Sequence, residues 1–263
     1  MIVYGHRGAK GEAPENTLAG FRYAYGNGTR HFELDLVLSR DGQPVVIHDL
    51  TIDRTTGKSA KVADCTAADL SLMDARKNTA SWSRPTGIPS LIEVMESCPE
   101  FAHLQLEVKA DTRQRLNILC NRLTELIQKN DLIDRVAITS SDTWFLQETK
   151  RRDRHIKTGL VADKRFPNPA RLAARLHCDY LCLNWRICSK SLVDAAHQRD
   201  IHVSTWTVNR IQDMLELEKK GIDSLITDYP TSTRIYFDNR AAQGGLRLPG
   251  RLDKDSDEKA TAP

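Results

Sequence analysis

The chain contains HLQLEV at residues 103–108, TRQRLNILCNRLTELIQKN at 112–130 and RVAITS at 135–140. The two outer segments are short, apolar and bounded by polar residues, which is typical of buried strands. The middle segment carries one apolar face at helical spacing, made of Leu116, Leu119, Cys120, Leu123, Leu126 and Ile127. A strand, a helix and a second strand in this order imply that the two strands run parallel.

The same alternation continues on both sides of this unit. Toward the C-terminus, strands are expected at 156–161, 179–183, 201–206 and 223–227, with helices near 142–152, from Asn168-Pro169, near 190–199 and near 210–220, and a short segment near 231–237 at the end. Toward the N-terminus, strands are expected at 2–4 and 32–38, a helix begins at Asn16, and Asp41-Gly42 turns the chain into a hairpin arm at 44–48.

Without the hairpin arm, this pattern contains eight strands, most of them followed by a helix. Eight such units in about 240 residues predict an α/β fold, a (β/α)8 TIM barrel, and a doubly wound open sheet is the alternative. The barrel is expected over 1–239, with a small insertion at about 50–100 between the second and third strands, irregular apart from a helix at 91–97. Residues 240–263 are rich in Gly, Pro, Lys and Asp, and predict a disordered tail.

Composition narrows the class of protein. The 263 residues include 38 Lys and Arg and 35 Asp and Glu. The resulting net charge of +3 gives no reason to expect binding of nucleic acid. No apolar run reaches the roughly 18 residues of a transmembrane helix, so no stable membrane insertion is expected. No signal peptide is visible, and six Cys without a C-x-x-C pair indicate reduced thiols and a cytoplasmic location. The oligomeric state is left open.

Three carboxylates gather at the predicted strand ends. Glu33 and Asp35 are two residues apart on one strand and therefore point to the same side, inside the barrel. Glu107 stands at the equivalent height of the next strand. Buried acids need a cation, and three oxygen ligands suit one divalent metal, Mg²⁺ or Ca²⁺. The alternative is a set of buried salt bridges with Arg7 or Lys109.

Two histidines and two cations stand beside these acids. His6 and His48 each follow a predicted strand, and a pair of imidazoles can serve as general acid and general base. Arg7 and Lys109 add positive charge, which favours an anionic substrate such as a phosphate. The alternatives are a capping role for His48 and simple neutralisation of the acids by the two cations. The remaining histidines are interpreted as ordinary surface or core residues.

Over about residues 2–235, the sequence resembles the glycerophosphodiester phosphodiesterase family. The resemblance rests on an ordered set of motifs: His6-Arg7-Gly8 with Pro14-Glu15-Asn16-Thr17, the run from Glu33 to Gly42 continuing to Val46-Ile47-His48-Asp49, Arg54-Thr55-Thr56-Gly57, Ile88-Pro89-Ser90-Leu91, Glu107-Val108-Lys109, Thr205-Trp206-Thr207-Val208-Asn209 and Thr227-Asp228-Tyr229-Pro230.

This resemblance implies a TIM barrel and a role for each matching residue. Glu33, Asp35 and Glu107 match the metal ligands of the family, and His6 and His48 match its acid/base pair. The other implied positions are the phosphate-contacting Arg7 and Lys109, the supporting Glu15 and Asn16, and the insertion, which caps the barrel mouth. Asn16 is expected to cap the first helix, and Glu15 to orient Arg7 or a metal-bound water. Trp206, at a strand end, is expected to contact the substrate or to fill the barrel top.

The expected activity is metal-dependent hydrolysis of small-molecule glycerophosphodiesters to glycerol 3-phosphate and an alcohol. One histidine takes the proton of the glycerol 2-hydroxyl, which attacks phosphorus, and the other protonates the departing alcohol. The resemblance implies a cyclic phosphate that water then opens. Neither the roles of the two histidines nor the alcohol, whether choline, ethanolamine, glycerol or inositol, follows from the sequence.

The sequence leaves three alternative functions. A lysophospholipase D or sphingomyelinase D type enzyme would need an apolar rim, and the insertion mixes Leu70, Leu72, Met73 and Trp82 with basic residues, which favours a small polar head group. A non-catalytic phosphodiester-binding protein conflicts with the intact histidines and carboxylates. A sugar isomerase is expected to have more acids at the later strand ends, where Asp228 stands alone.

Overall fold

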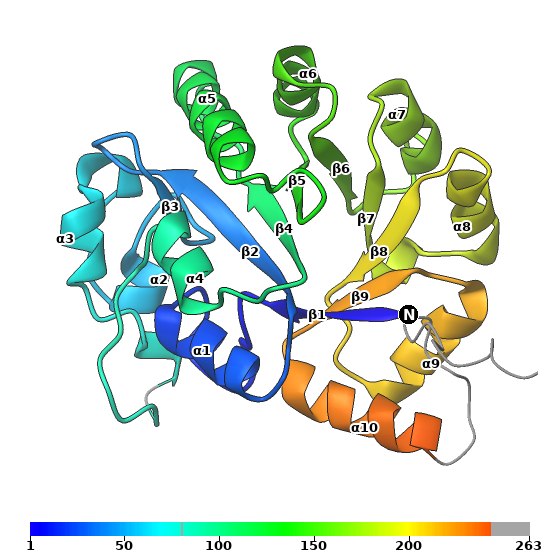
Figure 1. Ribbon diagram of the computed structural model, residues 1–263, viewed down its shortest axis with the longest axis horizontal. Helices are drawn as coiled ribbons and strands as arrows, with labels where there is room; N and C mark the ends of the chain where they lie inside the picture. Colours follow the sequence, from blue (N-terminus) through cyan, green and yellow to red (C-terminus); the bar gives the residue numbers. More distant parts are fainter. Residues whose placement is uncertain (80, 243–263) are drawn as a thin grey trace, which may run out of the picture.

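A computed structural model describes residues 1–79 and 81–242, and its parallel strands close into a barrel with helices outside (Figure 1). β1 pairs with both β9 and β2, which closes the ring and excludes the open sheet. In chain order the eight barrel strands are β1 (Ile2–His6), β2 (His31–Leu38), β4 (His103–Val108), β5 (Val136–Ser140), β6 (Lys157–Ala162), β7 (Tyr180–Asn184), β8 (His202–Trp206) and β9 (Ser224–Thr227). The predicted (β/α)8 barrel is confirmed.

The outer helices up to α9 lie between consecutive barrel strands in the chain, and α10 follows the last strand. Figure 1 shows α5 to α8 in an arc and α10 beside β1. They are α1 (Leu18–Gly26), α4 (Leu91–Ser97), α5 (Arg113–Lys129), α6 (Thr143–Arg152), α7 (Pro169–Arg175), α8 (Lys190–His197), α9 (Ile211–Lys220) and α10 (Pro230–Ala242). Most begin at a Ser, Thr, Asp or Asn whose side chain accepts a backbone N–H of the first turn. Within the described residues, none of the helices combines the length and apolarity of a membrane span.

Two sequence expectations about helices need correction. Asn16 does not cap the first helix, because Thr17 Oγ1 accepts the Gly20 N–H at 3.2 Å and the Asn16 side chain turns inward instead. The short segment expected near 231–237 is part of a longer helix, so Arg240 to Ala242 of the expected tail are helical. The rest of the predicted tail, 240–263, lies outside the described residues.

The segment predicted to be irregular contains short helices around a core of its own. The predicted hairpin arm precedes it as β3 (Pro44–Val46), antiparallel to β2. The elements of the segment itself are α2 (Asp53–Thr56), the 3₁₀ turns η1 (Val62–Asp64) and η2 (Lys77–Thr79), and α3 (Ala67–Ser71). Helices of three to five residues are too short to show a period, so the sequence could not reveal them. The apolar centre includes Val45, Ile52, Val62, Leu70 and Ile88.

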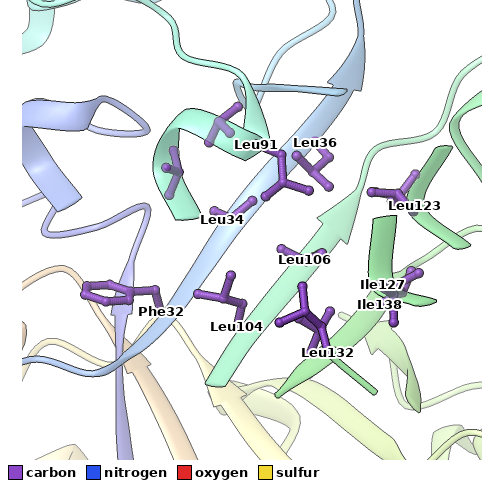
Figure 2. Close-up of a cluster of buried hydrophobic side chains, with 14 of the residues drawn as sticks. Phe32, Leu34, Leu36, Leu91, Leu104, Leu106, Leu123, Ile127, Leu132 and Ile138 are labelled. Atoms are coloured by element: carbon purple, nitrogen blue, oxygen red, sulfur yellow. The ribbon is translucent and has the colours of Figure 1, made fainter. Parts of the chain in front are cut away.

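β2 separates the apolar exterior of the barrel from its polar interior. Leu34 and Leu36 point outward and pack with Leu104 and Leu106 of β4 and with the apolar face of α5 (Figure 2). Each buried leucine contributes about 1.5–3 kcal/mol relative to exposure. Because side chains alternate along a strand, this packing turns the residues between the leucines into the barrel.

The N-terminal end of the barrel holds a cluster of aromatic rings around a buried histidine. His103 shares a hydrogen bond of 3.0 Å with the Tyr4 hydroxyl and one of 3.3 Å with that of Tyr180. Burial lowers the pKa of His103 to about 3, and the nearby His31 and His202 add to the effect. The cluster is therefore neutral in the folded protein at ordinary pH.

This neutral histidine should make the fold sensitive to acid. Below about pH 6.5 the unfolded chain gains a proton at His103 that the fold does not, so the free energy of unfolding falls as pH drops toward the folded pKa. At about pH 5, this effect is expected to lower the free energy of unfolding by about 2 kcal/mol. Urea denaturation measures the free energy of unfolding at each pH. Between about pH 7 and about pH 5, this free energy should fall less in His103→Gln than in the unmodified protein. The exposed His155→Gln is the control, and equal slopes in all three proteins would contradict the assignment.

Candidate active site

Seven of the predicted site residues line one cavity of about 410 Å³, which opens where the barrel strands end. They are His6, Arg7, Glu33, His48, Glu107, Lys109 and Trp206. The other three, Glu15, Asn16 and Asp35, do not line it but are bonded to residues that do or to one another. The sequence-predicted set therefore lies together in the fold.

The three carboxylates are brought together by the pairing of β2 with β4. Asp35 stands directly opposite Glu107 in the parallel register, and Glu33 lies two residues earlier on the same face. One oxygen from each of the three lies within 4.8 Å of the others. The expected salt bridges are present as well, since Lys109 Nζ lies 2.7 Å from Asp35 Oδ1 and Arg7 Nε lies 2.9 Å from Asp35 Oδ2.

These carboxylates fit a divalent metal ion. Burial raises the pKa of Glu33 well above its usual value, and the negative charges of Asp35 and Glu107 raise it further. Burial also acts to raise the pKa of Asp35, but Lys109 and Arg7 outweigh it and lower that pKa. Glu33 Oε1 is buried and has no hydrogen-bond partner among the described residues. A cation at this point would relieve the repulsion and occupy the unpaired oxygen.

The loop after β1 aims its side chains through two unusual backbone conformations. Arg7 and Gly8 adopt φ angles of 51° and 87°, and a side chain on Gly8 would also meet the backbone of α1. For a residue such as Arg7 this left-handed conformation is unfavourable, so the surroundings must hold it. The Arg7 N–H donates to the Glu33 carbonyl at 2.9 Å, and the Arg7 carbonyl accepts the Asn16 N–H at 2.9 Å. Asn16 Nδ2 in turn donates to Asp35 at 2.8 Å.

Each of the two histidines is hydrogen-bonded to a carboxylate. His6 Nδ1 lies 2.5 Å from Asp228 Oδ1, and His48 Nδ1 lies 2.6 Å from Asp49 Oδ1. Asn209 Nδ2 donates to the other oxygen of Asp228 at 2.7 Å. A carboxylate that accepts the Nδ1 proton leaves Nε2 as the atom that exchanges protons. Sequence reasoning noted the acids as strand-end or motif residues but did not pair them with the histidines.

Glu15 joins the barrel to the insertion. It accepts a hydrogen bond from Arg7 Nη1 at 2.8 Å and two from Arg54 of α2, at 2.8 and 2.9 Å. Burial acts to raise the pKa of Glu15, but the bonds from Arg54 and Arg7 lower it below its usual value. Arg54 also donates to Asp49, the partner of His48. Glu15 therefore contacts Arg7 as expected, and it also positions the insertion.

Comparison with known proteins agrees with this geometry. Residues 6–232 match the glycerophosphoryl diester phosphodiesterase family. The chain belongs to this family. It is 32% identical to a glycerophosphodiester phosphodiesterase of Caldanaerobacter subterraneus, over 87% of this chain and 94% of the relative. It is 26% identical to a lysophospholipase D of Rattus norvegicus, over 90% of this chain and 86% of the relative.

A solved structure shares the fold. A phosphodiesterase of Oleispira antarctica, in complex with the product sn-glycerol-3-phosphate, superimposes with a TM-score of 0.82 and 24% identity. The match covers 90% of this chain and 97% of the other. The likeness shows that the two chains have the same barrel fold.

Metal binding should be measurable without any substrate. Adding Mg²⁺, Ca²⁺ or Mn²⁺ to the metal-free protein should raise its melting temperature, because an ion bound only by the fold stabilises it by about 2.7 kcal/mol at 100 times its Kd. Glu33→Gln should abolish most of this increase. Without metal, the variant should melt at or above the temperature of the unmodified protein, because the substitution removes a repulsive buried charge.

The exposed Glu216→Gln serves as the matched control and should keep the full metal response. An unchanged response in Glu33→Gln would contradict the metal site.

Proposed function

We propose that this phosphodiesterase hydrolyses glycerophosphodiesters to glycerol 3-phosphate and an alcohol, with one Mg²⁺ or Ca²⁺ held by Glu33, Asp35 and Glu107. The observation that carries the proposal is one cavity lined by two carboxylate-bonded histidines, by Glu33 and Glu107 of the acidic cluster, and by cations that include Arg7 and Lys109. The name of the Caldanaerobacter relative and the product bound to the Oleispira enzyme support this substrate class.

The proposed roles follow from the charges of the side chains. Arg7 and Lys109 attract the phosphate oxygens and keep their own charge, because Asp35 raises the pKa of each against the effect of burial. One divalent ion in the acidic cluster would supply Lewis-acid stabilisation of the phosphate charge. His6 and His48 move the two protons through Nε2, one from the attacking glycerol 2-hydroxyl and one to the departing alcohol.

The second candidate function is cleavage of lysolipids, suggested by the name of the rat relative. An acyl chain requires an apolar surface near the mouth, and the insertion offers little. Leu70 is buried in the core of the insertion, and Trp82 packs edge-on against Tyr23 of α1. Of Leu70, Leu72, Met73 and Trp82, Leu72 is the exposed one, at 87%. The insertion therefore favours a small, deacylated diester.

A direct assay separates these two functions. The purified protein, treated with EDTA and then given Mg²⁺, Ca²⁺ or Mn²⁺ separately, is expected to release glycerol 3-phosphate from glycerophosphocholine and glycerophosphoethanolamine. Release should depend on the added metal. Activity on lysophosphatidylcholine alone would assign the protein to the lysolipid-cleaving class instead.

The histidine assignment is tested by substitution. His6→Ala and His48→Ala should each lower kcat by about 10²–10⁴, the usual contribution of a general acid or base. Both variants should keep the metal-induced rise in melting temperature, which separates loss of chemistry from loss of the fold. The exposed His155→Ala is the control. Near-normal turnover by either active-site variant would remove that histidine from the mechanism.

A further inference from the structure

A second cavity lies at the opposite end of the barrel from the active site. It has a volume of about 710 Å³ and is lined by residues at or just before the beginnings of β1, β2, β8 and β9 and by residues of α10, the helix that Figure 1 shows beside β1. This volume lies in the range of about 300–1,000 Å³ that small-molecule sites occupy. The residues that line the active-site cavity do not reach it.

Two polar atoms of this wall are buried without a partner. Thr29 is only 4% exposed, and its Oγ1 has no hydrogen bond among the described residues. The same is true of Arg234 Nε, from α10. Leaving such a group unpaired destabilises a fold by about 1–3 kcal/mol. Because the arginine nitrogen can only donate and the hydroxyl can turn its proton outward, both residues of the wall call for a hydrogen-bond acceptor.

Arg30, beside Thr29, adds a positive charge to the same wall. Its Nη1 donates to the Tyr25 carbonyl at 2.8 Å and to the Thr29 carbonyl at 3.0 Å, and its guanidinium stacks over the Tyr25 ring at 4.0 Å. These contacts hold the side chain in place without neutralising it. Within residues 1–79 and 81–242, Arg30 forms no ion pair, so its charge is available to an occupant of the cavity.

The two acids of the wall are already engaged. Asp223 Oδ2 accepts the Val203 N–H at 2.7 Å and lies 2.9 Å from His197 Nε2. Asp238 Oδ2 lies 3.5 Å from Arg234 Nη1. The charge left without a partner on this wall is therefore the positive one of Arg30, which favours an anion as the occupant.

Much of the remaining wall is apolar. Val3, Ile222 and Phe237 line the cavity, and Ile222 and Phe237 are buried. His31 also lines it, edge-on to the Tyr4 ring, and burial lowers the pKa of His31, so this imidazole is neutral. An occupant that matches both parts of the wall carries an apolar body beside its anionic group.

We propose that this cavity is a second ligand site, which binds a small carboxylate with a compact aromatic or branched body. The carboxylate accepts hydrogen bonds from Thr29 and Arg234 and faces the charge of Arg30, and the body covers Val3 and Ile222. The site is separate from the active site and does not depend on the proposed function.

Three probes with the same aromatic body test the charge preference. Phenylacetate is the anion, phenethylamine the cation and 2-phenylethanol the uncharged probe. Saturation-transfer NMR with the full chain should show contact with the ring protons of phenylacetate, and an NMR titration should give it a lower Kd than either other probe. Absence of contact, or equal binding of phenethylamine, would overturn the proposal.

Competition shows which cavity the probe occupies. Excess glycerol 3-phosphate should leave phenylacetate bound, because the two cavities have no lining residue in common. Displacement would place phenylacetate in the active site and reject the second site.

Thr29→Val keeps the shape of the side chain and removes the unpartnered hydroxyl. It should raise the Kd for phenylacetate by about 2- to 10-fold, the contribution of one hydrogen bond. Thr124→Val is the matched control. Thr124 lies on α5, is buried and also has an Oγ1 without a partner among the described residues, but it does not line the cavity.

Arg30→Gln removes the available charge and should raise the same Kd by about 2- to 5-fold. Its matched control is Arg135→Gln, because Arg135 likewise donates to backbone carbonyls and stacks over a ring, that of Phe101 at 4.0 Å, away from the cavity. A Kd that stays the same in Thr29→Val and Arg30→Gln contradicts the proposed site. A rise of the same size in the two control variants contradicts it equally.

Discussion

The arrangement of the active site depends on one buried carboxylate, Asp35. A fully buried, unpaired carboxylate is several kcal/mol unfavourable, so the fold must bring partners to it. Lys109 comes from the end of β4, Arg7 from the loop after β1, and Asn16 from the turn before α1. Satisfying Asp35 therefore fixes three separate segments around the cavity. Glu33 is compensated less fully: its Oε2 accepts the Arg7 N–H at 3.4 Å, but its Oε1 has no hydrogen-bond partner among the described residues. This difference between neighbouring acids on one strand leaves an oxygen that fits a metal ion.

A second network extends from this centre into the insertion. Arg7 is bonded to Glu15, Glu15 to Arg54, Arg54 to Asp49, and Asp49 to His48. The insertion packs around its own apolar core, but these polar contacts set where it sits on the barrel. His48 is therefore positioned by the same network of ion pairs that orients Arg7. His6 is held independently, by Asp228 at the end of β9.

The two ends of the barrel differ in their chemistry. The N-terminal end is filled by hydrogen-bonded rings, with His103 kept neutral between two tyrosines. The C-terminal end concentrates ionised groups, which the carboxyl ends of parallel strands and their loops present to a substrate. The neutral rings that pack the barrel and the ionised groups that line the active-site cavity thus lie at opposite ends of the same strands.

The sequence by itself determined the order of strands and helices, because apolar alternation and helical spacing depend on local pattern. It also placed Glu33 and Asp35 on one face, since side chains two apart on a strand point the same way. It could not show that Asp228 contacts His6, 222 positions away in the chain, nor that Thr17 rather than Asn16 caps α1. Those facts depend on the closure of the barrel and on the charge of Asp35. Only the tertiary structure decided them, because only there do distant residues compete for the same partners.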